Sequence, residues 1–332
     1  MNPLRTFGKV AVLGAGSWGT ALANVAARAG HDVYLWGRNA AQMDEIAEGH
    51  ENKRYLQGIS IESAVSPVSD LGCVRDADVI LLVVPAQAQR DSASAIAPLV
   101  KANAPVVICA KGIERGTQLF MGEAVAQALP HVPLALLSGP SFAHDVARGL
   151  PTAVTIAAHD GELARALAEA LGTSTFRLYH SDDMRGVEIG GSAKNVLAIA
   201  CGIATGCGLG ASANAALIAR GFAELRRFGA AYGARSETLM GLSGLGDLVL
   251  TCSSEQSRNF AFGVALGRGK TVEQASGGKL AEGAFTASVL VEMARKKDIE
   301  APICEAVDAL LTGRIDVPGA IDSLLSRPQR RE

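Results

Sequence analysis

The sequence predicts a doubly wound α/β domain with a mostly parallel sheet, followed by an all-α domain. Apolar runs of strand length alternate with helix-forming stretches through the first half of the chain. A glycine-rich turn follows the first of these runs directly. After about Val187 candidate strands become scarce, and helical stretches follow one another across glycine-rich junctions.

The predicted strands of the first half are short, and two of them, Asp78–Val84 and Pro105–Ala110, are continuous apolar runs, as expected of parallel strands buried on both faces. They cover Lys9–Leu13, Asp32–Trp36, Asp78–Val84, Pro105–Ala110, Leu134–Ser138 and Ala153–Ala157. The first helix is predicted over Thr20–Ala29, where alanine and leucine favour helix, and Gly30 is placed to end it.

The second half contains helix-forming stretches that predict an all-helical domain. They cover Ser192–Cys201, Ala211–Tyr232, Ser257–Leu266, Thr286–Lys297 and Cys304–Thr312. A length of 332 residues favours two domains over one. We therefore expect one domain over residues 1–187, a second over residues 188–326, and a disordered tail over residues 327–332.

The composition favours a globular protein and offers no bulk charge for a polyanionic partner. Hydrophobic residues make up 48% of the chain and the net charge is −2, so neither nucleic acid nor a membrane surface is expected as a partner. The six cysteines have no metal-ligand spacing, which favours buried free thiols and no metal site. No signal peptide or uncharged apolar run of about 18 residues is present. We expect a soluble, cytoplasmic protein.

The glycine-rich turn reads Gly14-Ala15-Gly16-Ser17-Trp18-Gly19. Gly14 permits a tight turn, Gly16 permits close approach of a pyrophosphate, and Gly19 lets the helix lie near the strand. The free N–H groups and the dipole of the following helix can hold phosphates. A glycine-rich turn without a ligand is the alternative, but strand, glycines and helix in this order favour a dinucleotide site.

The residue pattern after the second predicted strand bears on which dinucleotide is bound. Trp36-Gly37-Arg38-Asn39 contains no carboxylate that could bind a ribose 2′-hydroxyl. Arg38 can instead form a charge-assisted contact with the 2′-phosphate of NADP, although a solvated surface arginine is the plainer alternative. We predict that NADP is used, with NAD as a second cofactor.

Several polar residues stand in apolar surroundings. Lys111 follows one predicted strand, and the turn Ser138–Ala143 follows the next, so both point to the carboxyl edge of the sheet. Lys194 precedes the uncharged run Val196–Cys201. A lysine at the start of a buried helix needs a partner or a function, unless its side chain extends to solvent from the helix end.

Other isolated polar residues lie further along the chain. Asp247 stands among glycines and aliphatic residues, and Glu282 lies beside a glycine. Ser257-Arg258-Asn259 opens a predicted helix, where a cation and an amide can meet a phosphate. No Ser/His/Asp order or HExxH motif supports hydrolytic or zinc chemistry.

With these residues assembled, the sequence resembles bacterial NAD(P)-dependent glycerol-3-phosphate dehydrogenases from Lys9 to about Gly313. The most specific stretches are Gly14–Ala23, Ala110–Glu114, Ser138–Ala143, Gly190–Val196, Gly241–Cys252 and Gln256–Asn259. The resemblance implies an N-terminal Rossmann domain and a C-terminal helical domain similar to that of 6-phosphogluconate dehydrogenase, in a homodimer.

The resemblance also implies roles for individual residues, with Lys194 as the catalytic general base. The substrate-binding residues it implies are Lys111, Gly139, Ser141, Lys194, Asp247, Ser257, Arg258 and Asn259. Together with the glycines of the turn, the expected cofactor-binding residues are Gly14, Gly16, Ser17, Trp18, Gly19, Arg38, Lys111, Ala143, Arg258, Leu280 and Glu282. Leu280–Gly283 departs from the Val-Val-Glu-Gly type of sequence expected there, so the contact at Leu280 is less specific than that at Glu282.

The implied reaction is reversible hydride transfer between NAD(P)H and dihydroxyacetone phosphate, giving sn-glycerol 3-phosphate for glycerophospholipid synthesis. One alternative is a related β-hydroxyacid or 6-phosphogluconate-like dehydrogenase with a carboxylate substrate. Another is a redox-sensing regulator that binds a dinucleotide without turnover. The near-neutral charge and the absence of a helix-turn-helix pattern disfavour DNA binding, and Lys111, Lys194 and Asp247 together favour an enzyme.

Overall fold

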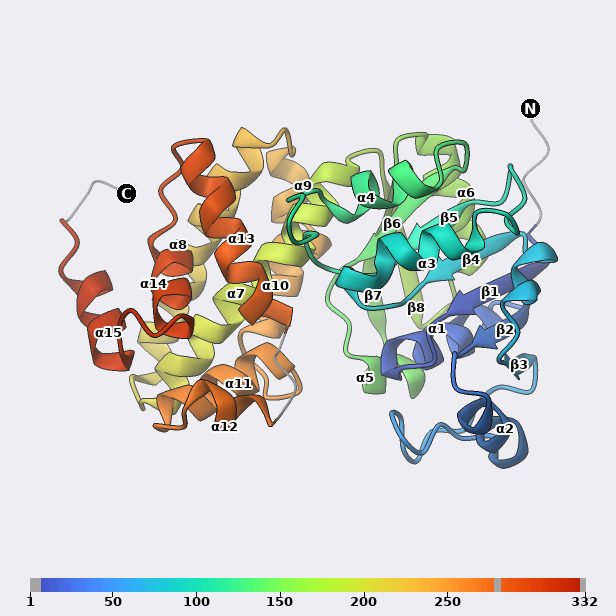
Figure 1. Ribbon diagram of the computed structural model, residues 1–332, viewed down its shortest axis with the longest axis horizontal. Coiled ribbons are helices and arrows are strands. Elements are labelled where there is room, and N and C mark those ends of the chain that lie inside the picture. The colour runs from blue at the N-terminus through green and yellow to red at the C-terminus, as the bar shows by residue number, and fades with distance from the viewer. Residues whose placement is uncertain (1–6, 278–281, 329–332) are drawn as a thin grey trace. The chain divides into compact units, whose positions relative to one another are not determined.

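The computed structural model describes residues 7–277 and 282–328. The chain divides into two compact units, residues 1–188 and 189–332. The first unit is built on a sheet and the second on helices, as labelled in Figure 1. The predicted fold class, a mostly parallel α/β domain followed by an all-helical one, is confirmed. Of the predicted disordered tail, residues 329–332 lie outside the described residues.

The sheet of the first unit has eight strands in the order β3-β2-β1-β4-β5-β6-β7-β8. Their bounds are β1 (Lys9–Leu13), β2 (Asp32–Trp36), β3 (Val65–Val68), β4 (Val79–Leu82), β5 (Val106–Ile108), β6 (Leu134–Ser138), β7 (Thr152–Ala158) and β8 (Phe176–Ser181). All neighbouring pairs are parallel except β6 and β7. The strand order reverses between β1 and β4, which is where doubly wound sheets bind ligands beyond the carboxyl ends of their strands.

Two strands escaped prediction because they lie at the edges of the sheet. β3 contains Pro67, which cannot donate a backbone hydrogen bond, and it pairs only with β2. β8 pairs only with β7 and is largely exposed, so it lacks the continuous apolar run that identified the central strands.

Helices cover both faces of the sheet. They are α1 (Ser17–Arg28), α2 (Ala40–Gly49), α3 (Gln89–Ile96), α4 (Met121–Ala128), α5 (Ala143–Ala147) and α6 (Gly161–Leu171), with short 3₁₀ turns η1 (Leu71–Arg75) and η2 (Ala86–Ala88). Alternate residues of the strands belong to two separate buried clusters. Val10 and Val12 join one cluster, whereas Ala11 and Leu13 join the other. The central strands are therefore buried on both sides, as their composition predicted.

The described part of the second unit contains helices and no strand. The helix α7 (Met184–Gly206) begins in the first unit and continues into the second. The others are α8 (Gly210–Ala231), α9 (Ser236–Met240), α10 (Asp247–Thr251), α11 (Arg258–Gly267), α12 (Val272–Ser276), α13 (Glu282–Lys296), α14 (Pro302–Leu311) and α15 (Val317–Leu325), with the π-helical turn η3 (Leu242–Gly246).

The expectation that a helix starts after Gly190-Gly191 is wrong, because α7 passes straight through this pair. A Cβ atom built on Gly190 would lie 2.4 Å from the carbonyl oxygen of Ser243. The glycine is therefore needed for close helix packing and not for a turn. Local sequence cannot distinguish these two uses of glycine, because only the packing partner differs.

Glycines also bring α7 and α11 into backbone contact. A Cβ on Gly202 of α7 would lie 2.2 Å from the Phe260 carbonyl oxygen, and a Cβ on Gly263 of α11 would lie 2.2 Å from the Ile199 carbonyl oxygen. Gly206 and Gly267, one turn further along each helix, make the same kind of approach. Since any side chain would force the helices apart, these four glycines set the position of α11 on α7.

One described helix, α7, is long and apolar enough to cross a membrane by length and composition. Of its most apolar 18-residue stretch, 94% is buried inside the fold. This burial is typical of the core helix of a globular unit.

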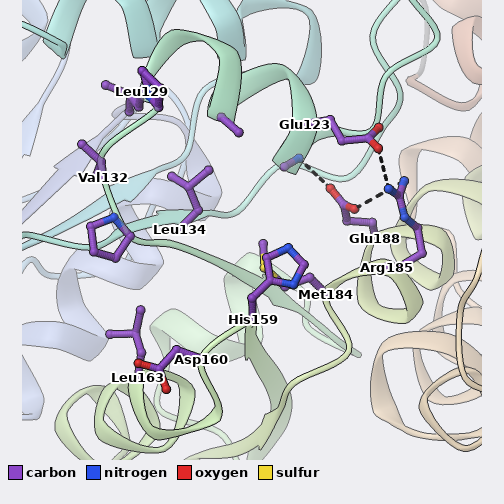
Figure 2. A pocket seen from close by; sticks show the side chains of 14 residues that line it. Glu123, Leu129, Val132, Leu134, His159, Asp160, Leu163, Met184, Arg185 and Glu188 are labelled. Atoms are coloured by element: carbon purple, nitrogen blue, oxygen red, sulfur yellow. Dashed lines mark hydrogen bonds and ion pairs between the residues drawn. The ribbon is translucent and has the colours of Figure 1, made fainter.

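A cavity of about 400 Å³ lies at the edge of the sheet opposite to the glycine-rich turn. Its lining includes Leu134, at the amino end of β6, and His159, which follows the carboxyl end of the antiparallel β7. Figure 2 shows apolar side chains on one side of this cavity and Glu123, Arg185 and Glu188 on the other. None of the predicted site residues that the structure describes lines it.

Glu188 is the buried carboxyl group of this cavity. Its Oε1 atom accepts a hydrogen bond from the Gly122 backbone N–H at 2.6 Å, and the Arg185 guanidinium lies 4.0 Å from its Oε2 atom. Burial raises the pKa of Glu188 from 4.5 to about 7, although the Gly122 N–H and Arg185 both act to lower it. The folded protein therefore holds a proton on Glu188 more tightly than the unfolded chain does.

We predict that Gly202→Ala lowers the stability of the protein by roughly 1–3 kcal/mol, because the new methyl group meets backbone that cannot move away. The midpoint of urea unfolding measures the effect. Gly49→Ala is the matched control, since a Cβ at that helix position meets nothing within 4 Å. Equal midpoints for the wild type and Gly202→Ala would contradict the proposed packing.

We also predict a pH-dependent effect of Glu188→Gln. Because the folded pKa is raised, the stabilising contribution of protonated Glu188 is complete below pH 4.5 and is lost as the pH rises through about 7. Over this interval the free energy of unfolding of the variant should therefore show a gain relative to that of the wild type, by up to about 3 kcal/mol. Glu162→Gln, at a carboxylate that is 78% exposed, should show no such gain. A pH-independent difference between Glu188→Gln and wild type would refute the assignment.

Candidate functional site

The glycine-rich turn connects β1 to α1 at the point where the strand order reverses. Gly14 adopts a φ of +123°, and a Cβ there would lie 2.7 Å from the Val83 carbonyl oxygen. A Cβ on Gly19 would lie 1.8 Å from the Gly14 carbonyl oxygen. Both glycines are thus required by the protein's own backbone, one for the turn and one for the approach of α1 to β1.

Gly16 differs from these two glycines. Its φ of −84° suits any residue, and a Cβ built on it meets nothing within 4 Å. No packing in the described protein requires a glycine here, while open space lies directly at the N-terminus of α1. A phosphate group approaching the backbone would fill that space, so the turn fits the pyrophosphate of a dinucleotide.

Ser17 and Trp18 form the first turn of α1. The Ser17 hydroxyl donates a hydrogen bond to the Tyr55 carbonyl oxygen at 2.8 Å, and Trp18 packs partly buried against the core of the unit. Their backbone N–H groups belong to the helix terminus and have no acceptor within the helix. These groups are the donors that an N-terminal anion site uses.

Arg38 is the second residue after the end of β2 and is exposed to solvent. Within residues 7–277 and 282–328, no carboxylate forms an ion pair with it. The neighbouring Asn39 accepts a hydrogen bond from the Gln42 backbone N–H at 3.2 Å and so caps α2. The end of β2 therefore presents a cation and no acid.

Lys111 and the turn after β6 come together at the carboxyl edge of the sheet. The Lys111 ammonium donates a hydrogen bond to the Gly139 carbonyl oxygen at 3.1 Å, and the Ser141 hydroxyl donates to the same oxygen at 3.0 Å. Gly139 has a φ of +147°, and a Cβ there would lie 2.8 Å from the Val154 Cα atom. Ala143 begins α5 immediately after this turn.

Lys194 lies inside α7 and not at a helix start, so an extended side chain reaching solvent from a helix end is excluded. Its side chain is 7% exposed. The Nζ atom lies 2.5 Å from Asp247 Oδ1 and donates a hydrogen bond to Thr251 Oγ1 at 2.9 Å. The Thr251 hydroxyl in turn lies 3.3 Å from Asp247 Oδ1, so the three side chains form a closed polar cluster in an apolar surrounding.

The turn η3 directly precedes Asp247 and positions it in this cluster. A Cβ on Gly244 would lie 1.9 Å from the Leu239 carbonyl oxygen, so η3 packs tightly on the end of α9. Single π-helical turns are rare and occur frequently at functional sites. Asp247 then begins α10 and is 1% exposed.

Thr251 is a member of the cluster that was not predicted from the sequence. A signal was present, because residues four positions apart share one face of a helix and Thr251 follows Asp247 by four. A threonine is too common in helices for that spacing alone to identify it. Its contact with Lys194, 57 residues away, is visible only in the folded chain.

Two buried thiols lie close to this cluster. The pKa of the Cys252 thiol is raised well above its ordinary value, first by its hydrogen bond with the Cys201 thiol and then by burial. Both cysteines are free, and the raised pKa keeps Cys252 a neutral thiol near neutrality. In the described part of the chain, no three potential metal ligands come together.

The segment Ser257–Asn259 begins α11. The Ser257 hydroxyl oxygen caps the helix by accepting a hydrogen bond from the Phe260 backbone N–H at 3.3 Å. Arg258 is exposed, and the described carboxylates form no ion pair with it. Asn259 Oδ1 accepts a hydrogen bond from the Gly283 backbone N–H at 2.9 Å. The amide N–H groups of Asn259 take no part in that hydrogen bond.

Glu282 is the first residue of α13, next to the Gly283 that Asn259 holds. A Cβ on Gly283 would lie 2.6 Å from the Asn195 carbonyl oxygen, so the start of α13 packs directly on α7. Leu280, the remaining predicted cofactor contact, lies outside the described residues.

Comparison with known proteins identifies the relatives of this chain. Residues 9–164 match the family model for the N-terminus of NAD-dependent glycerol-3-phosphate dehydrogenase, and residues 183–322 match the model for its C-terminus. The chain is 61% identical over 329 residues to a glycerol-3-phosphate dehydrogenase [NAD(P)+] from Azorhizobium caulinodans. That match covers 99% of this chain and 100% of the relative.

Solved structures agree with the sequence matches. A glycerol-3-phosphate dehydrogenase from Coxiella burnetii is 41% identical with a TM-score of 0.91, and the match covers 96% of this chain and 99% of that one. The enzyme of the same name from Saccharomyces cerevisiae is 27% identical with a TM-score of 0.83, again over 96% and 99% of the two chains. With both family models matched in order along nearly its whole length, this chain belongs to the NAD-dependent glycerol-3-phosphate dehydrogenase family.

Proposed function

We propose that the protein catalyses the reversible reduction of dihydroxyacetone phosphate to sn-glycerol 3-phosphate, with NADPH or NADH as the reductant. The observation that carries the proposal is the buried cluster of Lys194, Asp247 and Thr251 in a chain of this family. A buried ammonium is costly unless it is paired, and a lysine kept in an apolar helix is well suited to proton transfer.

Each unit has its own part in this function. The first unit, predicted over residues 1–187, would bind the dinucleotide at the turn Gly14–Gly19. The second, predicted over residues 188–326, would supply the reactive lysine, bind the substrate phosphate and carry the dimer contacts. The open space at Gly16 and the polar cluster around Lys194 support this division.

The bound dinucleotide supplies hydride to the C2 carbonyl carbon of the substrate. The protein's task is to stabilise the negative charge that develops on the carbonyl oxygen and to protonate it. Lys194, as an ammonium held by Asp247 and Thr251, would donate that proton in reduction. In oxidation the same nitrogen would accept the proton of the alcohol, as a general base.

The substrate phosphate would be held by the start of α11. Arg258 supplies an exposed cation, Asn259 supplies amide N–H groups, and the helix terminus supplies backbone N–H groups. Ser257 can donate its hydroxyl proton while its oxygen caps the helix. Binding at this end of the substrate would fix C2 for reaction. From the first unit, we propose further substrate contacts by Lys111, Gly139 and Ser141.

Arg38 would distinguish the two dinucleotides by pairing with the 2′-phosphate of NADP. The remaining cofactor contacts are proposed on the family resemblance. They are Gly14, Gly16, Ser17, Trp18, Gly19, Lys111, Ala143, Arg258, Leu280 and Glu282. We propose a cytoplasmic homodimer whose partners are small-molecule substrates. The free cysteines support a reducing compartment.

The first experiment follows NADPH oxidation with dihydroxyacetone phosphate, with unphosphorylated dihydroxyacetone as the control. Rapid oxidation with the phosphate alone is expected, because the phosphate supplies the binding energy that positions C2. Inactivity with both NADPH and NADH would overturn the proposal. Activity on a 2-keto carboxylate in place of the phosphate would favour the related hydroxyacid dehydrogenases, and binding without any turnover would favour the sensor.

For Lys194 we predict that Lys194→Met lowers kcat by roughly 10²–10⁴-fold, the usual contribution of a general acid–base group. Removing one partner of a buried ion pair also destabilises the fold, so Asp247 must be neutralised too. The double variant Lys194→Met/Asp247→Asn should melt close to wild type, bind NADPH normally and remain inactive. Wild-type turnover in either variant would remove Lys194 from the mechanism.

For Arg38 we predict that Arg38→Ala weakens NADP binding roughly tenfold or more and leaves NAD binding within about twofold, because only NADP carries the 2′-phosphate. Titration calorimetry with both dinucleotides measures the ratio. Arg54→Ala, at another arginine of the same unit, is the control. An unchanged NADP-to-NAD affinity ratio would show that Arg38 is only a solvated surface residue.

A further inference from the structure

One face of α1 is hydrogen-bonded to an irregular segment, residues 51–62, which we term the supporting segment. The side chains involved follow one another at helical spacing and so form a single stripe. They are Ser17, Thr20, Asn24 and Arg28. The stripe runs from the glycine-rich turn to the end of the helix, so the supporting segment is aligned along the whole of α1.

The far half of this contact is structural. Asn24 donates to the Ser60 carbonyl oxygen at 2.9 Å and accepts from the Glu62 backbone N–H at 3.1 Å. Arg28 forms an ion pair with the Glu62 carboxylate at 2.7 Å. Leu56 and Ile61 are buried in the core, which anchors the segment to the unit.

The near half of the contact reaches the glycine-rich turn itself. The Asn52 side chain is fully buried, and its amide nitrogen donates to the Ala15 carbonyl oxygen at 3.0 Å and to the Thr20 hydroxyl at 2.8 Å. Gln42 adds a second, longer hydrogen bond to the Ala15 oxygen at 3.3 Å. The carbonyl at the centre of the turn is therefore held from inside the protein.

The orientation of that carbonyl determines where the next N–H points. The Ala15 carbonyl and the Gly16 N–H belong to one planar trans peptide unit, so they point in opposite directions. Because Asn52 holds the oxygen inward, the Gly16 N–H is directed outward. The space beside Gly16 is open, with nothing within 4 Å of the position of a Cβ.

Asn52 maintains this arrangement at a cost. Its Oδ1 atom is buried and has no hydrogen-bond partner among the described residues. A buried acceptor without a partner loses its hydration and gains no hydrogen bond in return, a loss that an apolar side chain of similar size would avoid. Asn52 therefore holds the Ala15 carbonyl and the Thr20 hydroxyl while its own amide oxygen stays unpaired.

We propose that Asn52 is a positioning residue for the dinucleotide pyrophosphate, acting by orienting the Gly16 peptide. This role rests on the proposed function, since it requires that the turn binds a dinucleotide. Asn52 acts through the Ala15–Gly16 peptide and needs no contact with the cofactor.

The test compares Asn52→Leu with Asn24→Leu by titration calorimetry. Both asparagines are fully buried and both join α1 to the supporting segment, but only Asn52 contacts the turn. Each variant is titrated with NADPH and with 2′-AMP, which carries the adenosine and 2′-phosphate but no pyrophosphate. Asn52→Ser, which adds no bulk, is the second variant in case the leucine does not fold.

We expect Asn52→Leu and Asn52→Ser to weaken NADPH binding by about ten- to hundredfold, as for the loss of one hydrogen bond to a charged group. Their affinity for 2′-AMP should stay within about twofold of wild type. Asn24→Leu should lower the melting temperature yet leave both affinities within about threefold.

Wild-type NADPH affinity in the Asn52 variants would overturn the positioning role, as would equal losses for NADPH and 2′-AMP or an equal loss in Asn24→Leu. These outcomes leave the proposed function intact. Failure of the wild-type protein to bind NADPH or NADH at all would instead remove the proposed function, and the positioning role with it.

Discussion

The backbone contact between α7 and its neighbours is the constraint on which the second unit depends. Four glycines let α7 and α11 touch without side chains between them, and Gly190 gives the same closeness to the turn η3. These contacts hold the segments that carry the functional residues directly against α7. Asp247 follows η3 directly, Arg258 and Asn259 begin α11, and Lys194 lies one turn after Gly190. A displacement of η3 by a single methyl group would therefore move Asp247, and the same displacement of α11 would move Arg258 and Asn259, because a packed core transmits such shifts.

The cluster itself contributes more to chemistry than to stability. Two charges removed from water regain that cost only when the pair is close and its remaining hydrogen-bonding groups are satisfied. Lys194 and Asp247 lie 2.5 Å apart, and Thr251 bonds to the lysine. An apolar pair of similar volume would fill the same space at no electrostatic cost. The ion pair therefore argues for a function, and the neutral Cys252 thiol nearby offers no competing anion for the ammonium.

The first unit uses glycine and asparagine together for a related purpose. Gly14 and Gly19 bring strand, turn and helix into contact, while Gly16 leaves space for a ligand. Glycines alone would leave the turn free to rotate its peptides, since they impose the weakest conformational limits of any residue. The amide of Asn52, from a segment without regular secondary structure, removes that freedom at the Ala15 carbonyl.

Some elements could be predicted because the residues that specify them are adjacent in the sequence. The bounds of β1 and β2 follow from short apolar runs next to glycines, and the turn Gly14–Gly19 follows from its spacing. The tertiary structure decided what depends on distant partners. The helix α7 continues through Gly190 because the Ser243 backbone packs against that residue. Thr251 belongs to the polar cluster because its hydroxyl accepts a hydrogen bond from Lys194. Asn52 has its role because its amide bonds to the Ala15 carbonyl, 37 residues away. Periodicity and propensity report only on neighbours within a few residues, whereas these contacts arise when the chain packs against itself.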